Sequence, residues 1–320
     1  MSNSLKIIFA GTGNFALYHL TNLLSKHQIV GILTSPDRIA GRGKKLFFSA
    51  IKQFAIKHNI SLFQPQSECL SKKSYQKQIA DLKADIMVVI AYGIILPPYI
   101  LNIPRLGCIN VHSSLLPRWR GAAPIPRSII AGDKVTGVTT IKINRGIDTG
   151  DILHQMPCVI EKTDTSATVS EKLSKLGSMS MLITLEQFLE GKIYPQPQVQ
   201  SEHTSTYAKK IRKEEARLNW KLSAIENERY IRAFNPWPVS YFFIHGKYIK
   251  VWKASVLKNI NETKYQPGEI LLADKNGIQI ATAKDILNIE ELQPAGKKIM
   301  KVGEFLNSRK EWFTPGLILD

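Results

Sequence analysis

Two polar side chains stand two residues apart in an otherwise apolar segment, Cys-Ile-Asn-Val-His at residues 108–112. The alternation predicts a β-strand on which Asn110 and His112 leave the same face. An amide and an imidazole would then act on one spot of a bound molecule. Pro117 breaks the pattern soon afterwards, and residues 118–120 (Arg-Trp-Arg) suit a surface loop that carries contacts.

A carboxylate, Asp148, stands in the next polar turn, residues 144–151. An amide, an imidazole and a carboxylate suit the transfer of an acyl group directly to an amine, without a covalent enzyme intermediate. Asn110 can donate a hydrogen bond to the oxygen on which charge develops, and His112 can stabilise that oxygen or move the amine proton. Asp148 would hold the imidazole in place. The spacing alone fits three satisfied structural polar groups equally well.

Other site chemistries find less support in the residue pattern. There is no G-x-S-x-G nucleophile motif, and His112 has no partner at the spacing of a metal site, so we expect no metal. The remaining histidines are dispersed, at His19, His27, His58, His154, His203 and His245. We interpret the three scattered cysteines, Cys69, Cys108 and Cys158, as buried free thiols of a reducing compartment.

The elements that position these residues alternate between strand and helix. Residues 5–10 predict a strand that ends at the Gly11-Thr12-Gly13 turn and leads into a helix over 15–24, and residues 85–91 read as a strand buried on both faces. This alternation predicts an α/β fold: a Rossmann-like, mostly parallel sheet with helices on both faces. The glycine turn also satisfies G-x-G-x-x-A, but the next strand ends in Leu33 and Thr34 rather than in an acid, which disfavours a nicotinamide cofactor.

The character of the chain changes after residue 190. Residues 191–206 are polar and contain Pro195 and Pro197, which indicates an extended linker. From residue 207 onward, short strands separated by Gly, Asn and Asp turns predict a smaller antiparallel β-barrel resembling an OB fold. We therefore expect a catalytic domain over 1–190 and a second domain over 207–320.

The chain of 320 residues carries a formal net charge of +17. Residues 1–206 hold 23 Lys and Arg against 13 Asp and Glu, and residues 207–320 hold 20 against 13. Because the excess is spread over both halves, it favours a polyanion that contacts both domains over a single basic tail.

A short stretch, residues 35–45, concentrates four cations: Arg38, Arg42, Lys44 and Lys45. Pro36, Gly41 and Gly43 predict an irregular, strongly positive loop. It suits phosphate contacts, although a solvated surface loop would have the same composition.

The sequence also predicts where the protein resides. No apolar run reaches the roughly 18–20 residues that cross a bilayer, and a strand pattern begins at Leu5. We expect a cytoplasmic protein with no membrane contact.

The motif from Asn110 to Pro124, NVHSSLLPRWRGAAP, together with GIDTGD at 146–151, closely resembles the methionyl-tRNA formyltransferases. The resemblance covers nearly the whole chain. The Asn110, His112 and Asp148 set would be common to other folate-dependent formyltransferases, whereas the basic loop and the carboxyl-terminal motifs narrow it to the tRNA enzymes. Those further motifs are GRGKK at 41–45, YAKKI at 207–211, EEARL at 214–218, FNPWP at 234–238 and QPAGKK at 293–298.

The resemblance implies a formyl transfer with 10-formyltetrahydrofolate as co-substrate and the amino group of methionyl-initiator tRNA as acceptor, giving N-formylmethionyl-tRNA for translation initiation. Asn110, His112 and Asp148 would be catalytic. The loop with Arg38, Arg42, Lys44 and Lys45 would contact the tRNA, and the second domain would add further tRNA contacts. We also expect a monomer. The folate would lie against Ile90, Ala91, Tyr92, Ser114, Leu115, Leu116 and Pro117.

Two other functions stay open at this point. A sugar-nucleotide formyltransferase or a formyltetrahydrofolate hydrolase would use the same three residues, but would need neither the basic loop nor a basic second domain. An RNA-binding protein on a decayed catalytic fold would lack turnover, which the intact Asn110, His112 and Asp148 set disfavours.

Overall fold

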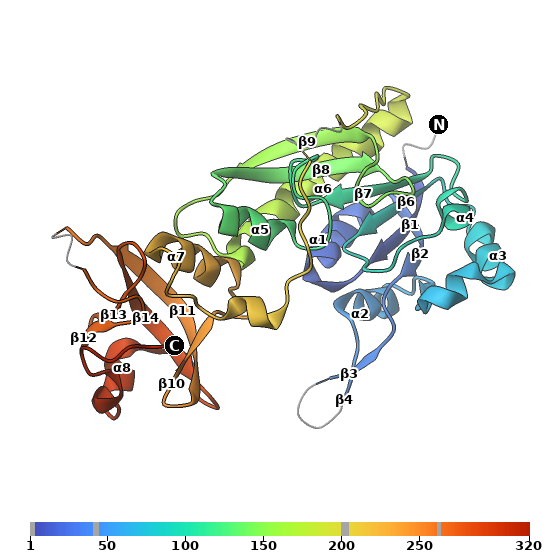
Figure 1. Cartoon of the computed structure of the whole chain (residues 1–320). Coiled ribbons are helices and arrows are strands. Elements are labelled where there is room, and N and C mark those ends of the chain that lie inside the picture. The colour runs from blue at the N-terminus through green and yellow to red at the C-terminus, as the bar shows by residue number, and fades with distance from the viewer. Residues whose placement is uncertain (1–3, 41–44, 200–204, 261–263) are drawn as a thin grey trace. The chain divides into compact units, whose positions relative to one another are not determined.

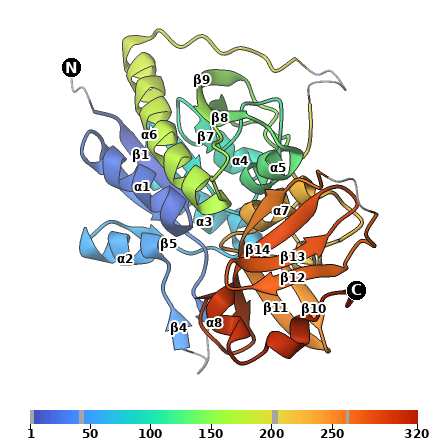
Figure 2. The same ribbon diagram turned by 90° about the vertical axis from the view of Figure 1, so that its left-hand side faces the viewer.

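The computed structural model describes residues 4–40, 45–199, 205–260 and 264–320. The chain divides into two compact units (Figures 1 and 2). The first unit takes the described residues of 1–124, 135–159 and 170–208, and the second takes those of 125–134, 160–169 and 209–320. The short segments 125–134 and 160–169 therefore belong to the second unit, although parts of the first unit flank them in the sequence.

The first unit is built on a seven-stranded sheet in the order β5-β2-β1-β6-β7-β8-β9. Strands β5, β2, β1, β6 and β7 run parallel, whereas β8 and β9 run antiparallel to their neighbours. This confirms the predicted Rossmann-like, mostly parallel sheet. The strands are β1 (Lys6–Gly11), β2 (Gln28–Leu33), β5 (Leu62–Phe63), β6 (Ile86–Ile90), β7 (Cys108–His112), β8 (Val135–Lys142) and β9 (Ile152–Val159).

Helices cover both faces of this sheet (Figure 1). On one face α1 (Gly13–Leu24) and α6 (Ser166–Glu190) lie side by side (Figure 2). They are so close that a Cβ on Gly177 of α6 would come within 2.7 Å of His19 Nε2 and 2.9 Å of Val111 Cγ1. The opposite face packs on α3 (Lys73–Asp81), α4 (Pro98–Leu101) and the short helix η1 (Ser67–Ser71). Helix α2 (Ala50–Lys57) follows the hairpin described next.

The stretch predicted to be an irregular basic loop is in part regular. β3 (Arg38–Ala40) and β4 (Lys45–Phe47) pair antiparallel, and the hairpin extends away from the main sheet (Figure 1). The prediction was wrong because Gly41 and Gly43 were read as ending regular structure, whereas they lie between the two strands. Residues 41–44 themselves are outside the described part of the chain.

The second unit contains an antiparallel sheet in the order β10-β11-β14-β13-β12, with β15 paired to β14. Segments outside these strands cover both edges: Leu218 N donates to Tyr241 O at 2.8 Å, and Ile270 N donates to Leu317 O at 2.8 Å. This barrel-like sheet confirms the predicted second fold. Its strands are β10 (Tyr241–Ile244), β11 (Lys247–Leu257), β12 (Ile270–Asp274), β13 (Gly277–Ala281), β14 (Ile286–Pro294) and β15 (Met300–Lys301).

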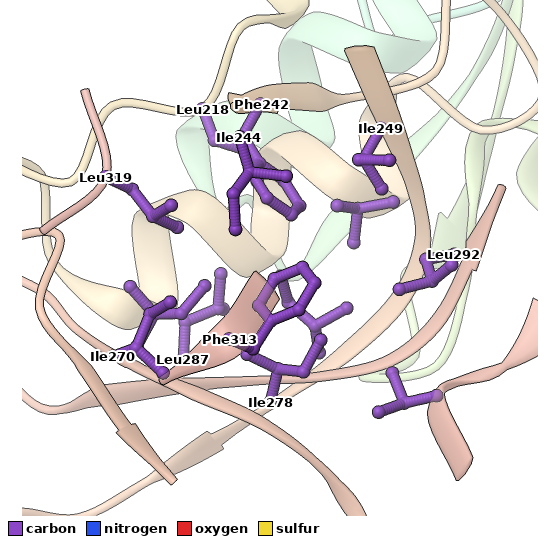
Figure 3. Packing of buried hydrophobic residues seen from close by; sticks show 14 of the residues in the cluster. Leu218, Phe242, Ile244, Ile249, Ile270, Ile278, Leu287, Leu292, Phe313 and Leu319 are labelled. Carbon is purple, nitrogen blue, oxygen red and sulfur yellow. The ribbon is translucent and has the colours of Figure 1, made fainter. Parts of the chain in front are cut away.

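The interior of this sheet is apolar. Alternate side chains of its strands point inward, as period-two patterning requires, and meet Phe313 and Leu319 from the chain's last segment (Figure 3). Phe242 and Phe313 pack edge to face with their centroids 6.3 Å apart. The surrounding helices are α7 (Ala224–Ala233), α8 (Val302–Leu306) and the short helices η2 (Lys213–Ala216) and η3 (Lys310–Phe313).

Helix α5 (Pro124–Ala131) belongs to the second unit from Ile125 onward. Its Arg127 forms an ion pair with Glu215 at 2.8 Å and donates to Lys209 O at 3.1 and 3.2 Å. Burial raises the pKa of Glu215, but the hydrogen bonds from Arg127 and from Arg212 N outweigh it, so the net shift is downward. Glu215 therefore stays ionised and keeps this contact near neutral pH.

Two further predictions concern the burial of the cysteines and the absence of a membrane-spanning segment. All three cysteines are free, but only Cys108 is buried, and burial raises the pKa of its thiol to about 12. The expectation of burial was wrong for Cys69 and Cys158, which are partly exposed. Among the described residues, no helix combines the length and the apolar character needed to span a bilayer.

Candidate active site

Strand β7 positions the two polar residues from which the sequence analysis began. It runs over residues 108–112, as the alternation predicts. Val111 points to the α1 and α6 face, whereas Cys108 joins the apolar cluster under α3 and α4. Because side chains alternate, Asn110 and His112 continue the Cys108 face beyond that cluster. Asn110 is half-buried and His112 is buried.

Asp148 reaches this face from the loop between β8 and β9. Its Oδ1 accepts from Asn110 Nδ2 at 3.4 Å, and its Oδ2 lies 3.5 Å from His112 Nδ1. Gly121 N also donates to Oδ2, at 2.9 Å. The structure therefore brings Asn110, His112 and Asp148 together, although 36 residues of sequence separate His112 from Asp148.

Both ring nitrogens of His112 face acceptors. Nε2 lies 2.8 Å from the Trp119 carbonyl oxygen, which can only accept, so Nε2 carries a proton. Nδ1 faces the Asp148 carboxylate. A neutral ring can donate to one of these groups, whereas the imidazolium can donate to both. The arrangement suits a positive charge that forms next to a reacting oxygen.

The loops around this cluster adopt unusual backbone conformations. Trp119 has φ 62° and Asp148 has φ 51°, both in the left-handed region that non-glycine residues rarely occupy. Such residues persist only where neighbouring contacts hold them. Here Trp119 N donates to Thr206 Oγ1 at 2.9 Å, and Gly121, with φ 104°, lies so close to Ala208 O that a Cβ would sit 3.0 Å from that oxygen.

The seven residues expected to contact a folate divide by exposure. Ala91, Leu115 and Pro117 are exposed or half-buried. The side chains of Ile90, Tyr92, Ser114 and Leu116 are at most 3% exposed and offer almost no surface to a ligand.

The buried Ser114 and Leu116 instead form hydrogen bonds that stabilise the loop after β7. Ser114 Oγ donates to Arg118 O at 2.6 Å, and Thr139 Oγ1 bridges Ser114 O and Leu116 N. Burial raises the pKa of Tyr92 well above its ordinary value, so its hydroxyl stays protonated.

Two of the four cations of the basic stretch belong to strands of the β3–β4 hairpin. Arg38 begins β3 and Lys45 begins β4, while Arg42 and Lys44 lie outside the described residues.

The base of this hairpin is tied to the body of the unit. Asp37 pairs with Lys52 of α2 and accepts from Gln64 Nε2 at 2.9 Å. The hydrogen bonds from Lys52 and Gln64 hold the pKa of Asp37 below its ordinary value.

Sequence reasoning missed the residues that brace the site from outside. Residues 205–208 run along the loop after β7: Arg120 N donates to Thr206 O at 2.8 Å, and Ala208 N donates to Arg120 O at 2.6 Å. Gln198 contacts both Arg120 and the Asp148 loop. Both segments border or lie within the stretch expected to be a linker, and nothing but the YAKKI motif marked this region in the sequence.

The donor groups of the site bear on metal binding. Among the residues that the structure places, no three His, Cys, Asp or Glu side chains gather in a way that could hold an ion. The candidate site thus offers hydrogen-bond donors and one carboxylate.

Comparison with known proteins assigns the family. The family model described as "Formyl transferase" matches residues 4–185, which include the whole Asn110, His112 and Asp148 cluster. The chain belongs to the formyl transferase family. A second model, "Formyl transferase, C-terminal domain", matches residues 210–310 of this formyl transferase.

Solved structures share the fold at low sequence identity. HypX from Aquifex aeolicus in complex with tetrahydrofolic acid matches with a TM-score of 0.64 and 17% identity, over 95% of this chain. An N-formyltransferase from Helicobacter canadensis, in complex with folinic acid and dTDP-3-aminofucose, matches with 0.62 and 17%, over 89% of this chain and 99% of that one. Glycinamide ribonucleotide transformylase 1 from Symbiobacterium toebii matches with 0.52 and 14%, over 62% of this chain and 96% of that one.

The chain spans about half the length of the HypX proteins that it matches, 48–49%. At these identities the likeness establishes the fold that this formyl transferase shares with them.

Proposed function

We propose that this formyl transferase moves a formyl group from 10-formyltetrahydrofolate to the amino group of methionyl-initiator tRNA. The main support for formyl transfer is that Asn110 and His112, on one face of β7, lie next to Asp148 of the loop between β8 and β9. It supplies an amide donor and an imidazole at one place, backed by a carboxylate. Structures of the same fold hold tetrahydrofolic or folinic acid, which supports a folate donor.

Each residue then has a defined part in the reaction. The acceptor amine attacks the formyl carbon, and charge develops on the formyl oxygen. Asn110 Nδ2 would donate to that oxygen, and the His112 ring, whose nitrogens face Trp119 O and Asp148, would stabilise it by its positive charge when protonated. The new C–N bond gives a tetrahedral intermediate, which collapses as the bond from the formyl carbon to the folate nitrogen breaks. The amine loses one proton, and the folate nitrogen gains one.

Asp148 supports both donors at once. Its carboxylate accepts from Asn110 and faces His112, so it orients the amide and balances a positive charge on the imidazole. Gly121 N fixes the second carboxylate oxygen. Asp148 would therefore hold Asn110 and His112 in the arrangement that best stabilises the charge on the formyl oxygen.

The tRNA acceptor is supported by sequence and charge. The basic stretch with Arg38, Arg42, Lys44 and Lys45 and the carboxyl-terminal motifs resemble the tRNA enzymes, and the net charge of +17 suits a polyanion. The β3–β4 hairpin, whose strands begin at Arg38 and Lys45, directly follows Asp37, which pairs with Lys52 of α2.

A sugar-nucleotide acceptor is the second candidate. The Helicobacter canadensis N-formyltransferase structure matches over 89% of this chain, and it is a complex with the small molecule dTDP-3-aminofucose. The dense positive charge is the feature that such an acceptor does not need.

An acceptor panel separates the candidates. The purified protein is given 10-formyltetrahydrofolate with charged methionyl-initiator tRNA, with a dTDP-amino sugar, or with buffer alone, and the formylated product is identified by mass spectrometry. We expect formylmethionine on the tRNA and no formylated sugar. Formylated sugar without formylmethionine would overturn the tRNA assignment, and release of formate in every arm would indicate a hydrolase.

A further inference from the structure

Gln198 lies in the polar, proline-containing segment after α6, yet its side chain is only 8% exposed. A buried amide has two donors and one acceptor oxygen to satisfy. Here the oxygen accepts from Arg120 Nε at 3.0 Å and from Arg120 Nη2 at 2.7 Å. The nitrogen donates to Asp148 O at 2.9 Å and to Gly150 O at 2.8 Å. All of these residues belong to the first unit.

These bonds act on both loops that form the candidate site. The two accepted bonds hold Arg120, whose main chain follows Trp119, the residue that faces His112 Nε2. The two donated bonds hold the main chain of Asp148 itself and of the next residue but one. One side chain therefore fixes the distance between the partner of Nε2 and the partner of Nδ1 of the same imidazole.

The backbone conformation of Asp148 requires hydrogen bonds of this kind. Asp148 has φ 51°, and the chain returns to β8 at Gly150, where a Cβ would lie only 1.7 Å from Lys142 O. A left-handed residue next to so close an approach needs outside contacts to persist. Gln198 supplies contacts on either side of Thr149.

We propose that Gln198 is a positioning residue for the transfer reaction, which holds the Asp148 carboxylate against Asn110 and His112. Its side-chain hydrogen bonds go to Arg120, Asp148 and Gly150, so it acts on Asn110 and His112 through the main chain of Asp148. Arg120 is its partner, held at 3% exposure. The inference rests on the proposed formyl transfer at Asp148.

Gln198→Leu tests the inference, with Gln196→Leu as the matched control. Leucine fills similar volume but makes none of the four bonds. Gln196 is in the same segment with an exposed side chain. A misplacement of about 1 Å at a reacting centre lowers rates by up to ~100-fold. We expect Gln198→Leu to lower kcat ~10-fold to ~100-fold with KM values changed less than about 3-fold, and Gln196→Leu to behave as wild type.

A double variant shows whether the effect runs through Asp148. In single-turnover assays, adding Gln198→Leu to Asp148→Asn should cost less than about 2-fold, because the carboxylate to be positioned is already gone. A full second loss on that background would overturn the inference. So would wild-type kcat in Gln198→Leu.

Gln198→Glu guards against simple misfolding. It keeps the acceptor for Arg120 but has no N–H to give to the Asp148 and Gly150 carbonyls. We expect kcat to fall while the unfolding temperature stays close to wild type, and unchanged kcat would contradict a positioning role.

The 15N chemical shifts of the His112 ring nitrogens report on the same geometry and can be measured without any turnover. They should change in Gln198→Leu and stay unchanged in Gln196→Leu, and unchanged shifts in both variants would overturn the inference. If the wild-type enzyme transfers no formyl group, the proposed function fails, and this arm still tests whether Gln198 controls the placement of Asp148.

Discussion

At the scale of single residues, Asn110 is the group whose loss should act most directly on the reaction. In the proposed mechanism, Asn110→Ala removes a donor to the formyl oxygen, and we expect it to leave the fold of β7 intact. Removing one such donor typically lowers kcat by ~10²–10³-fold. Steady-state assays should show this loss, while calorimetric titration should show folate binding within about 3-fold of wild type. Wild-type turnover would exclude Asn110 from the reaction.

His19 carries a prediction about acid stability. Burial lowers its pKa to about 4, against an ordinary 6.5, and the smaller opposing effect is the hydrogen bond of Nδ1 to Phe15 O. Below pH 6.5 the unfolded chain takes up a proton that the folded chain refuses until about pH 4. The stability is therefore fully present above pH 6.5 and is lost as the pH falls toward 4, by up to ~3 kcal/mol.

Urea unfolding at pH 7.5 and 4.5 checks this account of His19. His19→Leu removes the titrating ring and should lose ~2–3 kcal/mol less on acidification than wild type does. Equal losses in the two proteins would show that other groups dominate the acid response.

At the scale of elements, the approach of α6 to α1 and β7 depends on Gly177. In an open helix position Gly→Ala is stabilising by roughly 0.5–1 kcal/mol. At Gly177 the new Cβ would meet His19 Nε2 at 2.7 Å and Val111 Cγ1 at 2.9 Å, so the helix must shift. We expect Gly177→Ala to lower the free energy of unfolding by ~1–3 kcal/mol. A gain in stability would contradict the packing.

Lys175→Ala is the control for this helix. Its side chain is exposed two residues away from Gly177, so the change should stay within about 0.5 kcal/mol. A loss as large as that of Gly177→Ala would point to a general weakness of α6.

Individual elements show which parts of the fold could be predicted from the sequence. Strand β7 follows from strict alternation, because a strand with one polar and one apolar face leaves that pattern. The hairpin of β3 and β4 was missed because glycine punctuates loops and hairpin turns alike. α8, η2 and η3 were missed because pieces of four or five residues carry too little periodicity.

The candidate site shows the same limit. Asn110 and His112 are neighbours in sequence, so their shared face could be predicted. Asp148 could be proposed as their partner from its residue type and its polar turn, but the contact itself depends on how one loop folds back over β7, which no local pattern fixes. Gln198 could not be found, because a glutamine that follows Pro197 in a polar segment is typical of a solvated linker, and its burial is set by residues distant in the sequence.

At the scale of the whole molecule, the net charge of +17 predicts how salt acts. Contacts between Lys or Arg and phosphates release counterions, so affinity falls as salt rises, and the small folate donor should be affected less. Raising salt from about 50 to about 200 mM should raise KM for the tRNA at least ~10-fold, with KM for the folate changed less than about 3-fold. A salt-independent KM for the tRNA would contradict phosphate contacts.

The central claim is that this formyl transferase acts on methionine carried by the initiator tRNA. The measurement that tests it most directly is kcat/KM for formylation of methionyl-initiator tRNA beside methionyl-elongator tRNA, with the same folate donor. The account predicts formylmethionine on the initiator and a preference of about 100-fold or more over the elongator. Equal rates on the two tRNAs would contradict tRNA selection, and no formylmethionine on either would contradict the account as a whole.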